Sequence, residues 1–291
     1  MADKKISELT PITGANVVDT DDKIAIVDAS ASETVSITRE ELFKTNVDAY
    51  INDVIIGRSS GNLIQNTAVG FNSLKNNTTG NFNVTVGYET LLANTEGSNN
   101  VALGYRALRD NDSAGSNTAI GNESLRLNTT GASNTAIGRG ASFRNTTGGS
   151  NVSVGLSSLY NNTTGTDNTA VGRDALTNNE TSNFNTAVGR SALRANTSGN
   201  SNTAVGYQAM DNVTTGDSNT SIGKQADVVD ATGNNQIVIR AGTTYWYAAS
   251  GDPEGSVAAS VGSMYTRTDG GAGTTLYVKE SGTGNTGWVA K

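Results

Sequence analysis

The sequence contains no cysteine and no histidine, and only two of its 291 residues are proline. Without cysteine, neither a disulfide nor a thiolate metal site can form. Without histidine, the chain lacks the commonest general base and the commonest zinc ligand, and it cannot build a Ser-His or Cys-His nucleophile pair. We therefore predict a protein that is not an enzyme, with no catalytic residue, no cofactor and no metal site.

Charged and aromatic residues are also scarce, at 16% and 5% of the chain. The net charge is −7 and no basic run occurs, whereas binding to a nucleic-acid backbone needs clustered lysine and arginine. No stretch approaches the roughly 20 apolar residues of a membrane span, and the N-terminus has no apolar core suited to a signal peptide. We expect no nucleic-acid partner, no membrane insertion and synthesis in a cytoplasm.

Glycine, by contrast, is abundant, and ten of the 34 glycines recur at intervals of seventeen residues. An asparagine stands four residues before each of these ten glycines. A fixed period this short predicts a solenoid, in which each repeat is one coil. The glycines are Gly70, Gly87, Gly104, Gly121, Gly138, Gly155, Gly172, Gly189, Gly206 and Gly223, and the asparagines are Asn66, Asn83, Asn100, Asn117, Asn134, Asn151, Asn168, Asn185, Asn202 and Asn219.

Each coil has an aliphatic residue directly before the glycine and, in most coils, a leucine four residues after it. Two short apolar segments closed by turns predict two short strands per coil of a flattened β-roll. The glycine suits a corner that needs positive φ or close backbone approach. Ten or eleven coils spaced about 4.8 Å apart would form a rod about 50 Å long.

A second asparagine column opens an Asn-Thr-Thr-Gly turn in most coils. In a parallel stack its amides can hydrogen-bond to the coils above and below, as asparagine ladders do. The same Asn-x-Thr triplets also match glycosylation acceptors, but the metrical spacing favours the ladder. The column comprises Asn77, Asn94, Asn111, Asn128, Asn145, Asn162, Asn179 and Asn196.

The residues two before and three after the glycine are small, as in Ala68 and Ser73. Small columns make a thin coil with little interior, so we predict that several copies pack together and cover a flat apolar face. The array fades at both ends. Val54–Gly57 resembles a degenerate first coil, and Gln236–Arg240 keeps the register without the asparagine and the glycine, as capping repeats do.

The Asn-Thr-Ala-Val/Ile-Gly consensus resembles the head domains of trimeric autotransporter adhesins, whose left-handed parallel β-rolls repeat a similar motif in a shorter coil. Similar arrays occur in phage tail fibres. The resemblance covers about residues 54–240 and implies a homotrimer. The chain shows neither the secretion signal nor the membrane anchor expected of an autotransporter, so the phage family is favoured.

The flanking segments also resemble parts of phage tail fibres. Residues 23–28 and 33–38 predict a hairpin, and Thr38 and Glu41 form a capping box that opens a short helix. This layout resembles a module that docks fibres onto the tail or baseplate. Residues 262–280 predict two strands around a glycine-rich turn, with a third strand near 287–290, and this segment resembles a small domain in which three chains intertwine.

We therefore expect an all-β trimeric left-handed parallel β-roll, a solenoid of 17-residue coils, in three parts. Residues 1–50 would form a small N-terminal α/β attachment module, residues 51–240 the solenoid shaft and residues 241–291 a C-terminal intertwined β tip.

Candidate receptor-facing residues occupy the position after each glycine, which is variable and often large. Aromatic rings and guanidinium groups on a rigid rod suit stacking on sugars, although plain decoration of the stack edge explains the same pattern. These residues are Phe71, Tyr88, Tyr105, Arg139, Arg173, Arg190, Tyr207 and Lys224.

Tyr265 and Tyr277 are further receptor-facing candidates near the C-terminus. The neighbouring aromatic residues fit either a receptor-facing tip or the core of a trimer, and we favour the core for Tyr245, Trp246 and Trp288. An ice-binding face is disfavoured because valine interrupts the threonine column.

The expected function is that of a virion protein, a homotrimeric phage tail fibre that recognises a host surface glycan or protein. Its other partner would be a tail or baseplate protein. A structural spacer or adaptor that carries a separate receptor binder is the second hypothesis. A polysaccharide-degrading tailspike is the third, because acids such as Glu89, Glu123, Asp174, Glu180 and Asp217 are scattered along the chain rather than clustered.

Overall fold

The computed structural model describes residues 23–27, 34–38, 49–51, 54–57, 65–270 and 275–291. These residues form strands, turns and irregular segments and contain no helix, which confirms the all-β prediction for this part of the chain. The chain divides into two compact units, Met1–Val47 and Asp48–Lys291.

The described residues of the first unit form an antiparallel pair of strands. Strand β1 (Lys23–Val27) pairs with β2 (Thr34–Thr38), so that Lys23 lies opposite Thr38 and Val27 opposite Thr34. The predicted hairpin is therefore confirmed. The helix predicted to begin near Thr38 falls on residues 39–44, which lie outside the described residues.

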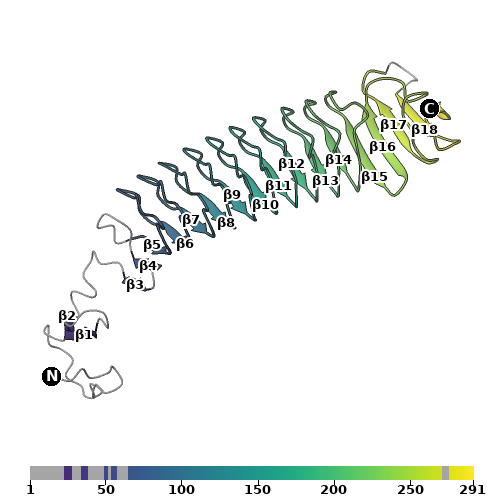
Figure 1. Cartoon of the computed structure of the whole chain (residues 1–291). Coiled ribbons are helices and arrows are strands. Elements are labelled where there is room, and N and C mark those ends of the chain that lie inside the picture. The colour runs from purple at the N-terminus through teal and green to yellow at the C-terminus, as the bar shows by residue number, and fades with distance from the viewer. Residues whose placement is uncertain (1–22, 28–33, 39–48, 52–53, 58–64, 271–274) are drawn as a thin grey trace, which may run out of the picture. The chain divides into compact units, whose positions relative to one another are not determined.

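The second unit is a solenoid that places one short strand in each coil, and its coils stack side by side (Figure 1). Neighbouring coil strands pair in parallel with a register of seventeen residues, as in Thr118 opposite Thr135. The ten strands are β5 (Thr67–Val69), β6 (Val84–Val86), β7 (Val101–Leu103), β8 (Thr118–Ile120), β9 (Thr135–Ile137), β10 (Val152–Val154), β11 (Thr169–Val171), β12 (Thr186–Val188), β13 (Thr203–Val205) and β14 (Thr220–Ile222).

Each strand buries only its middle residue, which is small in every coil. Ala119, for example, is fully buried between the outward-facing Thr118 and Ile120. The leucine column supplies the larger core side chains, and Leu125 and Leu159 are also fully buried. Two small residues and, in most coils, one leucine make the thin interior that the small columns predicted.

The prediction of two strands per coil is wrong. The leucine segment is a turn in which the leucine and the residue two positions before it have positive φ, as in Glu123 (56°) and Leu125 (48°). A left-handed residue turns the chain too sharply for a strand, although the neighbouring coils still exchange backbone hydrogen bonds there, as from Leu125 N–H to the Ala141 carbonyl (3.0 Å).

The ten repeat glycines occupy a corner that excludes any side chain. Their φ values lie between 120° and 138°, a region that L-residues rarely adopt. A Cβ built on Gly155 would lie 2.6 Å from the carbonyl oxygen of Gly172 in the next coil. Positive φ and close backbone approach therefore both apply, as predicted.

Both asparagine columns form buried ladders. In the first, the backbone N–H of each asparagine donates to the side-chain Oδ1 of the asparagine one coil earlier, as from Asn83 to Asn66 (2.8 Å). In the second, the Nδ2 group donates to the preceding Oδ1, as from Asn145 to Asn128 (2.8 Å). The second column is at least 99% buried, so its side chains are not accessible for glycosylation, and the ladder prediction is confirmed.

Both ladders end on a substituted residue. Gln236 replaces asparagine at the end of the first ladder, and its N–H still donates to Asn219 Oδ1 (2.9 Å). Val213 follows Asn196 in the second ladder and has no amide to donate. Asn196 Oδ1 instead accepts a hydrogen bond from the backbone N–H of Gly199 (3.1 Å).

The stack begins with antiparallel strands rather than with a degenerate coil. Strand β3 (Ala49–Ile51) pairs with β4 (Val54–Gly57), and β4 runs antiparallel to β5, with Ile56 opposite Val69. The prediction that Val54–Gly57 is a first coil is therefore wrong, because its chain direction is reversed. It covers the edge of β5 all the same, and an exposed strand edge is what a cap must cover.

The other end of the sheet continues from the last coil into the C-terminal segment. Strand β15 (Ile237–Ala241) pairs in parallel with β14, which confirms its predicted register. Beyond it lie β16 (Thr244–Ala249), β17 (Met264–Arg267), β18 (Leu276–Lys279) and β19 (Trp288–Ala290), each paired with the strand before it. The three strands predicted in residues 262–290 are confirmed.

Candidate functional site

The outer surface of the coil sheet carries no charged side chain. Each strand from β5 to β14, and the first three residues of β15, directs two side chains outward, and all 22 of them are threonine, valine, isoleucine or leucine. We call this surface the apolar face. Several of its aliphatic side chains are roughly 40% exposed, among them Val86, Ile137 and Ile222.

The apolar face continues onto the C-terminal strands. Ile239 of β15 lies opposite Trp246 of β16, and Trp246 lies opposite Met264 of β17. Trp246 is 47% exposed, and Leu276 and Val289 extend the exposed apolar surface across β18 and β19. Fifteen successive strands thus present one uncharged surface, and the monomer leaves it open to solvent. An apolar surface of this length is typical of a contact between protein chains.

The residue after each repeat glycine forms a second exposed feature, a row along one corner of the coils. We call it the corner row, and no acidic residue occurs in it. It comprises Phe71, Tyr88, Tyr105, Asn122, Arg139, Leu156, Arg173, Arg190, Tyr207 and Lys224. The structure exposes every predicted receptor-facing residue of this row, and its two halves differ.

The first half of the corner row is an aromatic stack. The ring centroids of Phe71 and Tyr88 lie 5.5 Å apart, as do those of Tyr88 and Tyr105, with interplanar angles of 14° and 12°. Arg106 packs over the Tyr105 ring at 4.8 Å. The stacked faces of these rings are therefore used against each other and against arginine, which leaves mainly ring edges to meet a ligand.

Glu89 ties this stack to its surroundings. Its carboxylate accepts a bond from Arg106 Nε (2.9 Å) and lies 3.4 Å from Arg109 Nε. Burial alone would raise the pKa of Glu89, but hydrogen bonds from Arg106 and Tyr88 and the two positive charges outweigh it and lower the pKa. The hydrogen bond with Glu89 and its negative charge raise the pKa of Tyr88. The ionised carboxylate of Glu89 therefore fixes Tyr88 and Arg106 in the aromatic stack.

The second half of the corner row is cationic. Arg139, Arg173, Arg190 and Lys224 are exposed, and only Arg173 makes an ion pair among the described residues, with Asp174 (3.0 Å). Arg190 and Lys224 lie 5.8 and 6.0 Å from the ring centroid of Tyr207, which stands in the coil between them. Three of the four cationic groups in this half of the row are therefore not neutralised by a carboxylate of the described residues.

The two remaining receptor-facing candidates are buried. Tyr265 is 1% exposed and its hydroxyl donates to the Ser250 carbonyl (2.8 Å), while Tyr277 is 6% exposed. Burial raises the pKa of Tyr265 to about 12. The prediction that these tyrosines face a receptor is therefore wrong for this chain, because their rings fill its C-terminal core beside Tyr247 and Trp288.

The aromatic residues that we assigned to a trimer core separate in the same way. Trp288 belongs to the core of its own chain, and its indole N–H donates to the Val257 carbonyl (2.7 Å). Tyr245 is partly buried and stacks on Tyr247 at 5.1 Å. Trp246 alone projects from the apolar face. Along β16 the side chains alternate between the two faces of the sheet, so Tyr247 and Ala249 are buried and Trp246 is exposed.

Three of the acidic residues considered for catalysis are held in ion pairs. Glu89, Glu123 and Asp174 each pair with an arginine of the same coil or the next one. Asp227 replaces the core leucine of its coil, and burial and the charge of Asp211 raise its pKa against the hydrogen bonds from the backbone of Asp211 and Asn212. Among the described residues, no cluster of three or more acidic side chains could hold a metal ion.

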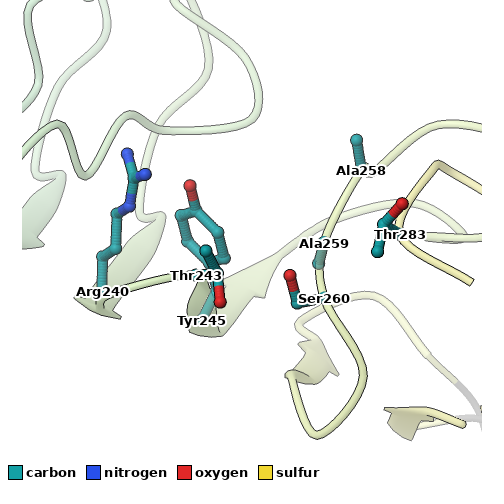
Figure 2. A pocket seen from close by; sticks show the side chains of 7 residues that line it. All are labelled: Arg240, Thr243, Tyr245, Ala258, Ala259, Ser260 and Thr283. Carbon is teal, nitrogen blue, oxygen red and sulfur yellow. The ribbon is translucent and has the colours of Figure 1, made fainter.

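A small pocket lies where the last coil meets the C-terminal strands. Arg240 and Tyr245 lie side by side along one wall, and Ala258, Ala259, Ser260 and Thr283 lie across from them (Figure 2). Its volume of about 180 Å³ is well below the roughly 300–1,000 Å³ of ordinary ligand pockets. Arg240 is also engaged, since it donates to the carbonyls of Gly242 and Gln225 (2.9 and 2.7 Å).

Comparisons of the chain with protein-family models, with curated proteins and with solved structures find no match. Within the described residues, no helix has the length and apolar character needed to cross a membrane.

Proposed function

We propose that this chain is a phage tail fibre that acts as a homotrimer, with the β-solenoid as its shaft. The apolar face is the observation that supports this proposal most directly. It runs unbroken over fifteen strands, carries no charge and remains exposed in the monomer. Three copies packed around a common axis would each bury this face and leave the three corner rows in solvent.

The proposal assigns the ends of the fibre different tasks. Residues 1–50 would attach the fibre to a tail or baseplate protein, and the rest of the chain would reach the host. A rigid rod with several weak sites recognises a surface by avidity, because linked sites multiply affinity without new contacts. The fibre would act in the virion by binding rather than by catalysis.

The mass of the purified chain in solution tests the trimer. We expect three times the monomer mass of 29.9 kDa by light scattering. Ile137→Asp combined with Val188→Asp places two charges on the apolar face and should yield monomers. Ala132→Asp is the matched control, because the same coil position already holds Asp217. A folded wild-type monomer would overturn the trimer.

A structural spacer or adaptor is the second candidate function, and two observations favour it. The aromatic rings of the corner row stack on each other, and the pocket beside Arg240 is small. Pre-incubating host cells with the full chain separates the two functions, because a receptor binder reduces phage adsorption and a spacer does not.

A further inference from the structure

The cationic half of the corner row stands out against an acidic protein. The chain carries a net charge of −7, yet Arg139, Arg173, Arg190 and Lys224 line up on one corner within six coils. Arg139, Arg190 and Lys224 have no carboxylate partner among the described residues, and all three are exposed. Three unneutralised charges of one sign along one corner create a local positive potential, although the net charge of the chain is negative.

The row is also held in place. Tyr207 packs between Arg190 and Lys224, with the two cationic groups 5.8 and 6.0 Å from its ring centroid. Cation–π contacts of this kind restrict long side chains that would otherwise sample many rotamers, so less entropy is lost when a ligand binds. The guanidinium of Arg190 keeps its hydrogen-bond donors free for a carboxylate, which it can meet with two parallel bonds.

The spacing of the cationic residues indicates how far apart the charges of a matching ligand should be. Coils lie about 4.8 Å apart, so Arg173 and Arg190 are separated by one such step, and Arg139 and Lys224 lie two steps, about 9.6 Å, beyond them on either side. A polyuronate, a linear polysaccharide with a carboxylate on every sugar or every second sugar, carries its charges at comparable intervals. A DNA duplex carries one charge per roughly 1.7 Å, far denser than this row, and the net negative charge of the chain repels it.

We propose that the corner row from Arg139 to Lys224 binds a linear acidic polysaccharide that lies along the axis of the solenoid. Arg139, Arg190 and Lys224 pair with carboxylates of the polysaccharide, Arg173 keeps its ion pair with Asp174, and Tyr207 offers its hydroxyl between Arg190 and Lys224. The proposal names the substrate class of the host glycan in the function proposed above and rests on that function for its biological setting. Binding itself requires only the folded solenoid.

The test measures binding of the full-length protein to alginate, a linear polyuronate, by isothermal titration calorimetry. Neutral dextran and single-stranded oligo-dT serve as comparison ligands. We expect alginate to bind, dextran not to bind, and the affinity to fall between about 50 mM and about 200 mM salt, as it does for charge-driven contacts. Absence of alginate binding, or tighter binding of oligo-dT, would overturn the proposal.

A pair of matched charge reversals locates the site. Arg190→Glu should weaken alginate binding by about tenfold or more, because a like charge then faces the carboxylates. Arg144→Glu makes the same change on another exposed arginine, five positions further along the coil than the corner row, and should change the affinity by less than about twofold. Equal effects of the two variants would overturn the assignment, provided that both melt at the wild-type temperature.

Failure of this proposal can be distinguished from failure of the fibre proposal. The mass of the same sample reports the trimer independently of any ligand. If the protein is a trimer but does not bind alginate, only the corner-row proposal is overturned. If it is a monomer that binds alginate through Arg190, only the proposal of a trimeric fibre is overturned.

Discussion

A methyl group at Gly155 would lie 2.6 Å from the carbonyl oxygen of Gly172, on a backbone with a φ of +134°. Both the clash and the left-handed conformation oppose any side chain there, and the tight stacking of coils leaves no room to relax. We expect Gly155→Ala to lower the free energy of unfolding by about 2–4 kcal/mol, measured by chemical denaturation.

Gly149→Ala is the control for this change. Gly149 has no positive φ, and its coil position elsewhere holds Ala132, Thr166 and Asp217. An alanine there should change stability by less than about 1 kcal/mol. Comparable losses in the two variants would show that the repeat glycines are not special.

Asp227 is a partly buried carboxylate that makes no ion pair with a described residue, and the positive charge of Arg240 offsets its burial only in part. Its raised pKa means that the folded state binds the proton more readily than the unfolded state does. Stability from this group is therefore present below the ordinary aspartate pKa of about 3.9 and is lost as the pH rises through the folded-state value.

Asp227→Asn should accordingly raise the melting temperature at pH 7, and the gain should shrink as the pH approaches 4. The asparagine keeps an Oδ1 atom to accept the Asp211 N–H (2.8 Å). Thermal unfolding across this pH range provides the measurement. A variant that melts below the wild type at pH 7 would contradict the sign of the shift.

At the scale of the coil, the asparagine ladders join neighbouring coils whose strands are only three residues long. Asn162 Nδ2 donates to Asn145 Oδ1 (2.7 Å) and to the Gly165 carbonyl (3.0 Å), and its Oδ1 accepts from Asn179 (2.9 Å). Asn162→Ala leaves these buried groups without partners, and we expect a loss of about 2–5 kcal/mol in the free energy of unfolding.

The neighbouring Asn161 provides the control for the ladder. Its side chain makes one long, exposed hydrogen bond to Asn178 (3.3 Å). Asn161→Ala should cost less than about 0.5 kcal/mol in the same denaturation experiment. The ladder would lose its assigned role if the two alanine variants proved equally stable.

The period of seventeen determined much of this architecture from the sequence alone. The residue type repeated in a column predicts the environment of that column. Gly155 belongs to the crowded corner, Ala119 to the thin interior and Asn162 to the buried amide ladder. The turn at Leu125 could not be predicted, because leucine is not a residue that signals positive φ. Apolar spacing alone does not separate a short strand from a tight turn with an inward side chain.

The C-terminal aromatics show a second limit of sequence reading. Tyr265 and Trp246 occur in similar apolar strands, yet one is buried and the other exposed. The face each residue occupies depends on the strand register, and a shift by one residue exchanges the two faces. The register of β16 follows from the hairpin that places Ala241 of β15 opposite Thr244 and from the pairing of β15 with β14, and the sequence of β16 itself has no alternating pattern that reveals it.

At the scale of the whole solenoid, the molecule has two surfaces able to recruit further chains. One is the apolar face, which runs along the stack. The other would be the strand edge at each end of the stack of parallel coils. Strand β4 covers the edge of β5 and strand β16 covers the edge of β15, both by antiparallel pairing. Parallel coils of identical register would otherwise continue from one molecule to the next, so reversal of chain direction gives the stack a defined length.

Deleting residues 242–291 would remove β16 and uncover the edge of β15, with its free N–H and carbonyl groups and the hydrophobic Ile237, Val238 and Ile239. We expect this variant to form large, concentration-dependent assemblies in light scattering, because an exposed, flat, apolar edge is a template for pairing. Deleting residues 1–47 is the control, since it leaves every strand pairing from β3 to β19 intact and should retain the size distribution of the full chain. A truncated chain that lacks residues 242–291 and stays dispersed would show that the antiparallel strands are not what limits the stack.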